Sequence, residues 1–333
     1  MKHDDIIKRL KGARPLSEAV LDLGNVPTGS YALNRIISGE YTKGIPIGAI
    51  TEFCGNSSTG KTVFITHLIR EAQQQSFYTI MVDSENAYNS KFAESLGVDP
   101  EKLIYCAPET LEDCFETMES LVEEIREKDK DTPIVIAYDS IAVSPIREEF
   151  KDGENGSFDS HNMIGAMRAK LQGACLRKIN SSLKKNKIGL LVVNQLRQKV
   201  GDSKYTSGNT KAAGGRALEY YLTIALKCVA NKKDGSLKDD NGKSIGLKGT
   251  VENTKNKYGA PYQDCEFKLF YDEGLDEWYG LAHQLRMDGL LGGKRPWYTC
   301  GDKKVQPKSL KEKVLNAEKD SPFYKIKEKL GLV

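Results

Sequence analysis

The sequence predicts an α/β protein with a mostly parallel central sheet flanked by helices, followed by an antiparallel extension and a small C-terminal domain. Two observations carry this prediction. Short segments such as 134–138 and 190–193 are apolar throughout, and they alternate with segments whose apolar residues recur every three or four positions. Strands that are apolar on both faces are typical of parallel sheets covered by helices on both sides. The 333 residues, 39% of them hydrophobic, suffice for one large domain plus a small one, or for two domains.

We expect the chain to begin with a short amphipathic helix over residues 1–13, followed by an extended linker to about residue 30. A helix this short needs a surface to pack on, which is either the chain's own core or a neighbouring copy. From residue 47 onward, strands, turns and helices alternate. The strands are expected at 47–54, 78–82, 134–138 and 190–193, and the helices at 61–75, 111–126 and 163–185.

Beyond residue 217 the pattern changes to longer alternating strands, which predict an antiparallel extension of the sheet. These strands are expected at 219–230, 247–255 and 262–271. The last segment, 275–333, is expected to be a small, mostly helical unit. Between Lys294 and Lys329 it contains eleven Lys or Arg against five Asp or Glu, so it is the most basic part of the chain.

Composition excludes several classes of protein. The net charge is only 49 − 46 = +3, so attraction to a polyanion must depend on where the charges lie. No apolar run approaches the roughly 18 residues that a membrane span needs, and Asp4 and Asp5 interrupt what a signal peptide would keep apolar. The seven cysteines lack metal-ligand or disulfide-framework spacing. We therefore expect a soluble, cytoplasmic protein with reduced cysteines.

Residues 55–62, GNSSTGKT, fit the pattern GxxxxGK[ST] between a predicted strand and a predicted helix, which is the context of a P-loop. Gly55 and Gly60 allow the backbone to wrap closely around a phosphate chain, with N–H groups and a helix N-terminus facing the negative charge. Lys61 can reach the outer phosphates, and the Thr62 hydroxyl can ligate Mg²⁺. A chance Gly-rich turn is the alternative, and the strand–helix context disfavours it. The sequence therefore predicts a nucleoside triphosphate site.

Acidic residues follow two of the predicted strands. Asp139 ends the strand 134–138, the usual place for an acid that holds Mg²⁺. Asp83 and Glu85 follow the strand 78–82, and the carboxyl ends of parallel strands converge on the ligand crevice. One of these two acids can orient a water against the γ-phosphate, but alternation along the chain does not choose between them.

Asn194 and Gln195 close the strand 190–193 and are expected at the same crevice. A neutral amide there can contact the γ-phosphate without adding negative charge. Because a polar, Gly-rich loop follows at 198–215, loss of the phosphate contact could release that loop. An amide that merely caps the strand end is the alternative.

Six segments together resemble the RecA recombinases. Besides the P-loop they are MVDSENAYN (81–89), IVIAYDSIAVSP (134–145), VVNQLRQKVG (192–201), AAGGRALEYY (212–221) and TKNKYGAPY (254–262). The resemblance covers roughly residues 28–275 and continues more weakly to the end. The segment 167–179, MRAKLQGACLRKI, and the compact size resemble phage UvsX-type enzymes more closely than the bacterial form.

The resemblance implies a RecA-like P-loop ATPase core and a role for each matching residue. Glu85 matches the glutamate that activates water, and Gln195 matches the amide that links the γ-phosphate to loop order. Lys255 and Lys257 match paired lysines that reach the ATP of the neighbouring protomer; without the resemblance, a solvated edge strand would be favoured for them. The nucleotide-binding residues implied are Gly55, Asn56, Ser57, Ser58, Thr59, Gly60, Lys61, Thr62 and Val63 of the P-loop, Asn89 and Phe92 at the adenine, and Asp139, with Thr62 and Asp139 as the Mg²⁺ ligands.

Two loops, 147–165 and 196–215, match the DNA-binding loops of the family. The second is rich in cations and glycines, which suits a phosphate backbone bound without regard to sequence. The first is unexpectedly acidic, so its DNA contacts are expected just beyond it. The DNA-binding residues expected from both loops are Arg168, Lys170, Arg197, Lys199, Lys204, Lys211, Gly214, Gly215 and Arg216. The basic C-terminal unit suggests extra duplex binding or, equally, a solvated helical face.

The leading hypothesis is a DNA-dependent ATPase that uses ATP and Mg²⁺, forms a head-to-tail helical filament on single-stranded DNA, and exchanges strands with a homologous double-stranded DNA. In this interpretation residues 1–30 form an N-terminal helix and polymerisation linker, 31–272 the ATPase and DNA-binding core, and 273–333 a small basic C-terminal domain. Single-stranded-DNA-binding and mediator proteins are candidate partners, and no membrane partner is expected. A RecA-like ring ATPase, such as a helicase or regulatory motor, is the first alternative, and a small-molecule P-loop kinase is the second.

Overall fold

The computed structural model describes residues 23–151, 158–198, 210–212, 215–230 and 235–333. The amphipathic helix expected at residues 1–13 lies outside the described residues, as does the linker up to residue 22. Among the helices of the described ranges, none is both long enough and apolar enough to cross a membrane.

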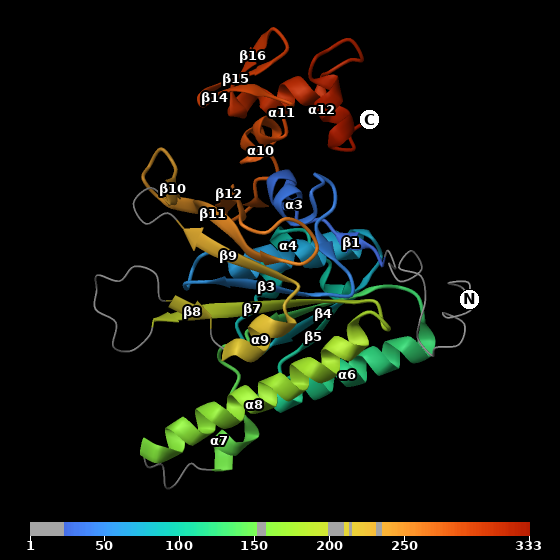
Figure 1. The fold of residues 1–333 in the computed structure, drawn as a ribbon, viewed down its shortest axis with the longest axis vertical. Helices are drawn as coiled ribbons and strands as arrows, with labels where there is room; N and C mark the ends of the chain where they lie inside the picture. The colour runs from blue at the N-terminus through green and yellow to red at the C-terminus, as the bar shows by residue number, and fades with distance from the viewer. Residues whose placement is uncertain (1–22, 152–157, 199–209, 213–214, 231–234) are drawn as a thin grey trace, which may run out of the picture.

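A large twisted sheet forms the centre of the molecule (Figure 1), with the strand order β13-β12-β11-β9-β3-β7-β6-β4-β5. From β9 to β5 every neighbouring pair is parallel. These strands are β3 (Ile50–Gly55), β4 (Tyr78–Asp83), β5 (Leu103–Cys106), β6 (Ile134–Asp139), β7 (Ile188–Gln198) and β9 (Ile224–Ala230). The mostly parallel α/β sheet predicted from the apolar strands is therefore confirmed. Strand β5 lies at the edge of the sheet and was not expected from the sequence.

The antiparallel extension begins one strand later than expected. It consists of β10 (Ser236–Lys238), β11 (Ser244–Asn256), β12 (Gln263–Phe270) and β13 (Gly274–Leu275). The single strand expected at 219–230 is wrong: α9 (Gly215–Tyr221) precedes β9, and β9 runs parallel to β3. The physical reason is that Leu218 and Leu222, four residues apart, are both buried, which is the period of a helix packed on the sheet.

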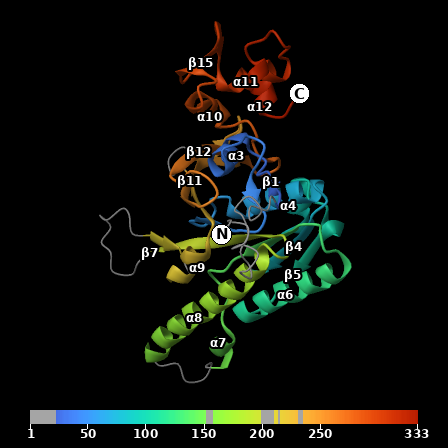
Figure 2. The same cartoon turned by 45° about the vertical axis from the view of Figure 1, so that its right-hand side comes forward.

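Helices cover both faces of the sheet, so it has a hydrophobic core on each side. α3 (Tyr31–Ser38) and α4 (Lys61–Gln74) lie on one face, and α6 (Leu111–Lys128), α8 (Phe158–Leu183) and α9 lie on the other (Figures 1 and 2). α6 and α8 lie side by side in both views. The shorter elements are β1 (Asn25–Val26), β2 (Ile45–Pro46), α5 (Ser90–Ser95), η1 (Pro100–Lys102), α7 (Arg147–Lys151) and β8 (Thr210–Ala212). Within the loop expected at 147–165, residues 147–151 belong to α7 and residues 158–165 to α8, so the described part of this segment is helical.

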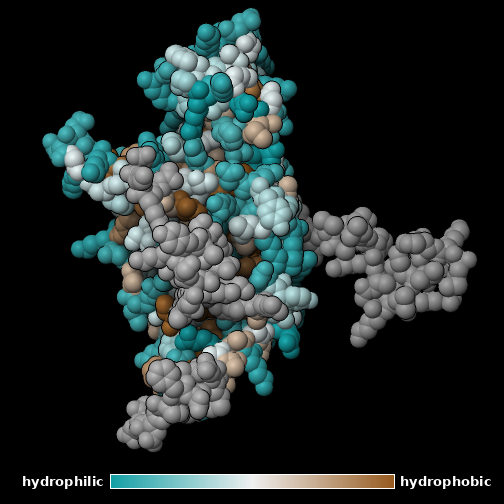
Figure 3. Space-filling view, turned by 60° about the vertical axis from the view of Figure 1, so that its left-hand side comes forward, coloured by the Kyte–Doolittle hydropathy of each residue, from teal (hydrophilic) through white to brown (hydrophobic). Residues whose placement is uncertain are grey.

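The C-terminal unit has its own small core, to which Tyr31 and Tyr41 from the α3 region contribute. Its elements are α10 (Leu281–Met287), β14 (Gly292–Lys294), β15 (Trp297–Cys300), β16 (Lys303–Val305), α11 (Pro307–Leu315) and α12 (Tyr324–Lys329). The expectation of a mostly helical unit missed this three-stranded sheet, whose strands are only three or four residues long. Arg35 on α3 forms a bidentate ion pair with Asp288, which links the unit to α3. At the top of Figure 3 this unit presents mainly hydrophilic side chains.

Candidate nucleotide-binding and catalytic site

The P-loop joins the end of β3 to the start of α4, as predicted. Gly60 has φ = 87° at the N-terminus of α4, a conformation that favours glycine. A Cβ on Gly55 would lie 2.5 Å from the Cys228 carbonyl oxygen of β9, so this position has no room for a side chain. Lys61 Nζ donates to the carbonyl oxygens of Asn56 (2.7 Å) and Gly55 (3.2 Å), so the lysine lies folded back over its own loop. Burial lowers the pKa of Lys61.

Thr62 and Asp139 meet at the end of β6, where the sequence predicts the metal ligands. Thr62 Oγ1 donates to Asp139 Oδ2 at 2.8 Å, and Asp139 is 8% exposed. Burial raises the pKa of Asp139 to about 6, and the hydrogen bond from Thr62 opposes this shift. A hydroxyl and a carboxylate are hard oxygen donors, and the residues present therefore fit Mg²⁺. A bound cation would favour the ionised carboxylate.

The structure separates Asp83 from Glu85. Asp83 is 1% exposed, and its carboxylate accepts hydrogen bonds from the backbone N–H groups of Glu85 (3.1 Å) and Tyr88 (2.8 Å) and from the Tyr105 hydroxyl (3.1 Å). Asp83 thus shapes the turn after β4. Glu85 instead lines the pocket above the P-loop, and its Oε1 accepts from Ser140 Oγ at 2.7 Å. Of the two acids, only Glu85 faces the pocket.

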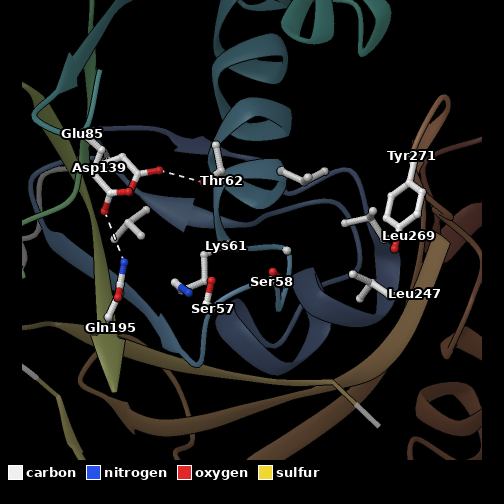
Figure 4. A pocket seen from close by; sticks show the side chains of 13 residues that line it. Ser57, Ser58, Lys61, Thr62, Glu85, Asp139, Gln195, Leu247, Leu269 and Tyr271 are labelled. Atoms are coloured by element: carbon white, nitrogen blue, oxygen red, sulfur yellow. Dashed lines mark hydrogen bonds between the residues drawn. The ribbon is translucent and has the colours of Figure 1, made fainter. Parts of the chain in front are cut away.

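Gln195 reaches the same pocket from β7. Its Nε2 donates to Glu85 Oε1 at 3.3 Å, and Figure 4 shows this pair beside the pair formed by Thr62 and Asp139. Two polar side chains from different strands therefore meet above the P-loop, as the convergence of parallel strand ends predicts.

The pocket has a volume of about 380 Å³, within the usual range for a small-molecule site. Its lining comprises Ser57, Ser58, Gly60, Lys61, Thr62, Val63, Glu85, Asp139, Val193, Gln195, Leu247, Leu269 and Tyr271. Leu247, Leu269 and Tyr271 were missed by sequence reasoning, because they come from β11, from β12 and from the residue after β12, far along the chain. Figure 4 shows Tyr271 across the pocket from Glu85 and Asp139.

Several predicted nucleotide contacts lie outside the lining of this pocket. Thr59 is buried, and its hydroxyl donates to the Asn56 carbonyl, so this pair shapes the loop. Asn89 caps α5: its Oδ1 accepts from the Phe92 backbone N–H at 3.0 Å. The Phe92 side chain packs against the core on the α4 side of the sheet.

Lys255 and Lys257 lie at the far end of β11 from their own pocket. Leu247, near the start of β11, lines the pocket, whereas Lys255 comes eight residues later on the same strand. At about 3.3 Å per residue the two positions are separated by about 26 Å. Lys255 Nζ instead donates to the Glu219 carbonyl oxygen, and Lys257 Nζ to that of Tyr220 at 3.4 Å. Neither lysine is among the described residues that line the pocket of its own chain.

Six of the nine predicted DNA-binding residues are described, and they lie in three places. Arg168 on α8 is paired with Glu149 of α7 (Nη2–Oε1 2.8 Å), and Lys170 is exposed on α8. Arg197 and Lys211 are opposite each other in the β7–β8 pairing. Gly215 and Arg216 begin α9. The remaining residues, Lys199, Lys204 and Gly214, lie outside the described residues.

Fold and site together define a P-loop nucleotide-binding protein with a doubly covered parallel sheet. The RecA N-terminal domain family matches residues 11–276. RecA of Aquifex aeolicus is 33% identical over 312 residues, covering 92% of this chain and 84% of that protein. RecA of Nocardia farcinica is 33% identical over 321 residues, covering 95% and 86%. RecA of Streptomyces coelicolor is 34% identical over 316 residues, covering 92% and 78%.

The chain therefore belongs to the RecA family, and it is a recombinase of the RecA type. Membership implies an ATPase that binds nucleotide. The closer likeness to phage UvsX-type enzymes remains a prediction, because the three relatives above are bacterial.

Proposed function

We propose that the chain is a DNA-dependent ATPase that assembles head to tail on single-stranded DNA and exchanges strands with a homologous duplex. The observation that carries this proposal is that the P-loop pocket and the lysine pair Lys255 and Lys257 lie at opposite ends of β11. Leu247, near the start of that strand, lines the P-loop pocket, whereas Lys255 and Lys257, at and just beyond its other end, lie outside the described lining and are proposed to meet the nucleotide of a second copy. An interface between unlike surfaces that does not close generates a helical filament.

In the proposed reaction, Lys61 and the P-loop N–H groups bind the phosphates, and Thr62 and Asp139 would hold Mg²⁺. When bound, this ion would neutralise the charge that develops on the transferred phosphoryl group. Glu85 takes the proton of the attacking water, since its carboxylate faces the pocket. The Gln195 amide leaves Glu85 to contact the γ-phosphate, which alters the strand end from which the second DNA loop begins.

The adenine site is proposed to lie on the Tyr271 side of the pocket. Leu247 and Leu269 give this side an apolar surface, and the half-exposed Tyr271 ring offers a stacking face. Asn89 and Phe92 remain predicted contacts of the base, and they would complete its site from α5.

DNA is proposed to bind between the two loops by its backbone phosphates. The cations assigned to this surface are Arg168, Lys170, Arg197, Lys199, Lys204, Lys211 and Arg216, with Gly214 and Gly215 allowing close backbone approach. Residues 1–30 are proposed to serve polymerisation, 31–272 to form the working core, and the basic unit 273–333 to meet duplex DNA.

One comparison tests this function. ATP hydrolysis is measured with and without single-stranded DNA, and electron micrographs are recorded with DNA and a non-hydrolysed ATP analogue. We expect hydrolysis to rise strongly with DNA, together with helical filaments. Closed rings would favour the ring ATPase, and phosphate transfer indifferent to DNA would favour a small-molecule kinase.

A further inference from the structure

Glu52 is a buried carboxylate that the proposed mechanism does not use. It lies in the middle of β3, between Val192 of β7 and Ala225 of β9, and is 4% exposed. Its neighbours along the strand include Ile50 and Phe53, both fully buried. A charged group in such a place costs free energy unless it is paired, and an apolar residue would satisfy the packing alone.

The structure connects Glu52 to the catalytic pocket through a single side chain. Asn194, itself fully buried, donates from Nδ2 to Glu52 Oε1 at 2.7 Å. The Oδ1 of the same amide accepts the backbone N–H of Gln195 at 2.9 Å. The Gln195 side chain then donates to Glu85. We call Glu52, Asn194 and Gln195 the buried relay.

A carboxylate has a specific effect in this arrangement, because it only accepts hydrogen bonds. Asn194 must therefore turn its NH₂ group toward Glu52, and this leaves its carbonyl oxygen for the Gln195 N–H. A neutral amide at position 52 could accept or donate, so it would not fix the orientation of Asn194. Burial, the largest effect, raises the pKa of Glu52, and the negative charge of Glu219 acts in the same direction. The hydrogen bond from Asn194 and the positive charge of Lys255 oppose this shift and favour the ionised carboxylate.

We propose that Glu52 is a positioning residue, which orients Asn194 and thereby holds the Gln195 backbone so that its side chain can exchange Glu85 for the γ-phosphate. This inference rests on the proposed function of Gln195. It predicts that Glu52 matters for ligands that carry a γ-phosphate and not for ADP, because Glu52 is not among the described residues that line the pocket.

The test is a pair of dissociation constants, for ADP and for adenosine 5′-(β,γ-imido)triphosphate, measured by calorimetry on the full chain with Mg²⁺. In Glu52→Gln we expect affinity for the triphosphate analogue to fall about five- to tenfold, the effect of misdirecting one hydrogen bond, with ADP affinity unchanged. Thr51→Val is the matched control, since Thr51 is fully buried on the same strand; it should leave both constants unchanged. An equal loss for both ligands in Glu52→Gln, or no loss, overturns the proposal.

A charge exchange gives a second, independent measurement. Asn194→Asp alone sets two carboxylates against each other and should lower triphosphate affinity further. The double variant Glu52→Gln/Asn194→Asp restores a donor–acceptor pair with reversed polarity, so it should recover most of the lost triphosphate affinity. If affinity is not recovered in a protein with parental thermal stability, the relay is contradicted.

Gln195→Ala separates the two proposals. If it does not weaken triphosphate binding relative to ADP, the proposed role of Gln195 fails, whereas an effect there without one in Glu52→Gln rejects the relay alone.

Discussion

At the scale of single residues, Asp83 and Glu85 illustrate how two similar acids acquire different tasks. Asp83 is the last residue of β4, and it accepts two backbone N–H groups of the following turn and the Tyr105 hydroxyl of β5. Glu85, two residues later, accepts from Ser140 and Gln195 at the pocket. Because Glu85 lines the pocket and Asp83 does not, Glu85 is the base that we propose.

Glu85→Gln should keep nucleotide and DNA binding but lose hydrolysis by about two to four orders of magnitude, the usual contribution of a general base. Single-turnover hydrolysis and nucleotide affinity are measured on the same preparation. Asp83→Asn is the comparison: we expect it to lower the melting temperature, because the turn loses acceptors. Parental hydrolysis by Glu85→Gln would exclude this residue as the base.

The P-loop could be predicted from the sequence because its parts lie within eight consecutive residues, 55–62. The choice between Asp83 and Glu85 could not be made from the residues, since it depends on the Tyr88 N–H and the Tyr105 hydroxyl. Tyr271 escaped prediction for a similar reason: only the antiparallel pairing of β11 and β12 brings it to the pocket.

At the scale of elements, the spacing of apolar residues correctly predicted whether a long segment forms a strand or a helix. The misassigned elements are short or lie at the sheet edge. β5 has only four residues, and Ile104 and Tyr105 are partly exposed, so its sequence lacks the continuous apolar run of a buried strand. The last turn of α9, residues 219–221, fell within the strand expected at 219–230, because two leucines four residues apart satisfy period 2 as well as the helical period.

His67 links α4 to β13 and predicts a pH dependence of stability. Its Nε2 accepts the Leu275 backbone N–H at 2.9 Å, it is 1% exposed, and burial lowers its pKa to about 3. The unfolded chain takes up a proton near pH 6.5, whereas the folded chain stays neutral down to about pH 3, so stability falls as the pH falls through this window. From pH 7 to 5 this group alone should remove about 2 kcal/mol from the free energy of unfolding.

Urea unfolding of the parent and His67→Gln at pH 7 and pH 5 measures this contribution. The introduced glutamine keeps a hydrogen-bond acceptor but does not titrate. Between pH 7 and pH 5 the free energy of unfolding should therefore fall by about 2 kcal/mol less in the variant than in the parent. His283→Gln, at an exposed position of α10, is the matched control and should follow the parent. The assignment is refuted when both variants lose as much stability as the parent.

The ion pair between Arg168 and Glu149 joins α8 to α7 and competes with the proposed DNA contact of Arg168. Glu149→Gln should therefore tighten single-stranded DNA binding up to about fivefold, the value of a partly exposed ion pair. Glu148→Gln removes the same formal charge one residue away and should tighten binding less. The affinity of each variant for single-stranded DNA is measured by fluorescence anisotropy. An equal gain in affinity in both variants would show that net charge, and not the ion pair with Arg168, is responsible.

At the scale of the whole molecule, β11 connects the pocket with the two lysines that we propose to act on a neighbour's ATP. The strand spans the sheet from Leu247 at the pocket to Lys255 at the opposite end, where the lysines rest on backbone carbonyls of α9. Cations that act on a transferred phosphoryl group must lie within contact of it. We propose that the ATP on which Lys255 and Lys257 act belongs to another copy, so that hydrolysis depends on assembly.

Lys257→Ala should consequently leave a protomer that binds nucleotide through its own P-loop but lacks DNA-stimulated hydrolysis. The decisive measurement mixes Lys257→Ala protein with Glu85→Gln protein, each inactive alone. At some interfaces of a mixed filament, the intact Lys257 of one protomer meets the intact Glu85 of the next, and a complete site is rebuilt. With equal amounts and random order, about a quarter of the interfaces carry this pairing, so ATPase should recover to roughly a quarter of the parental rate. Mixed filaments that contain both proteins and remain inactive would mean that each site is built within one chain.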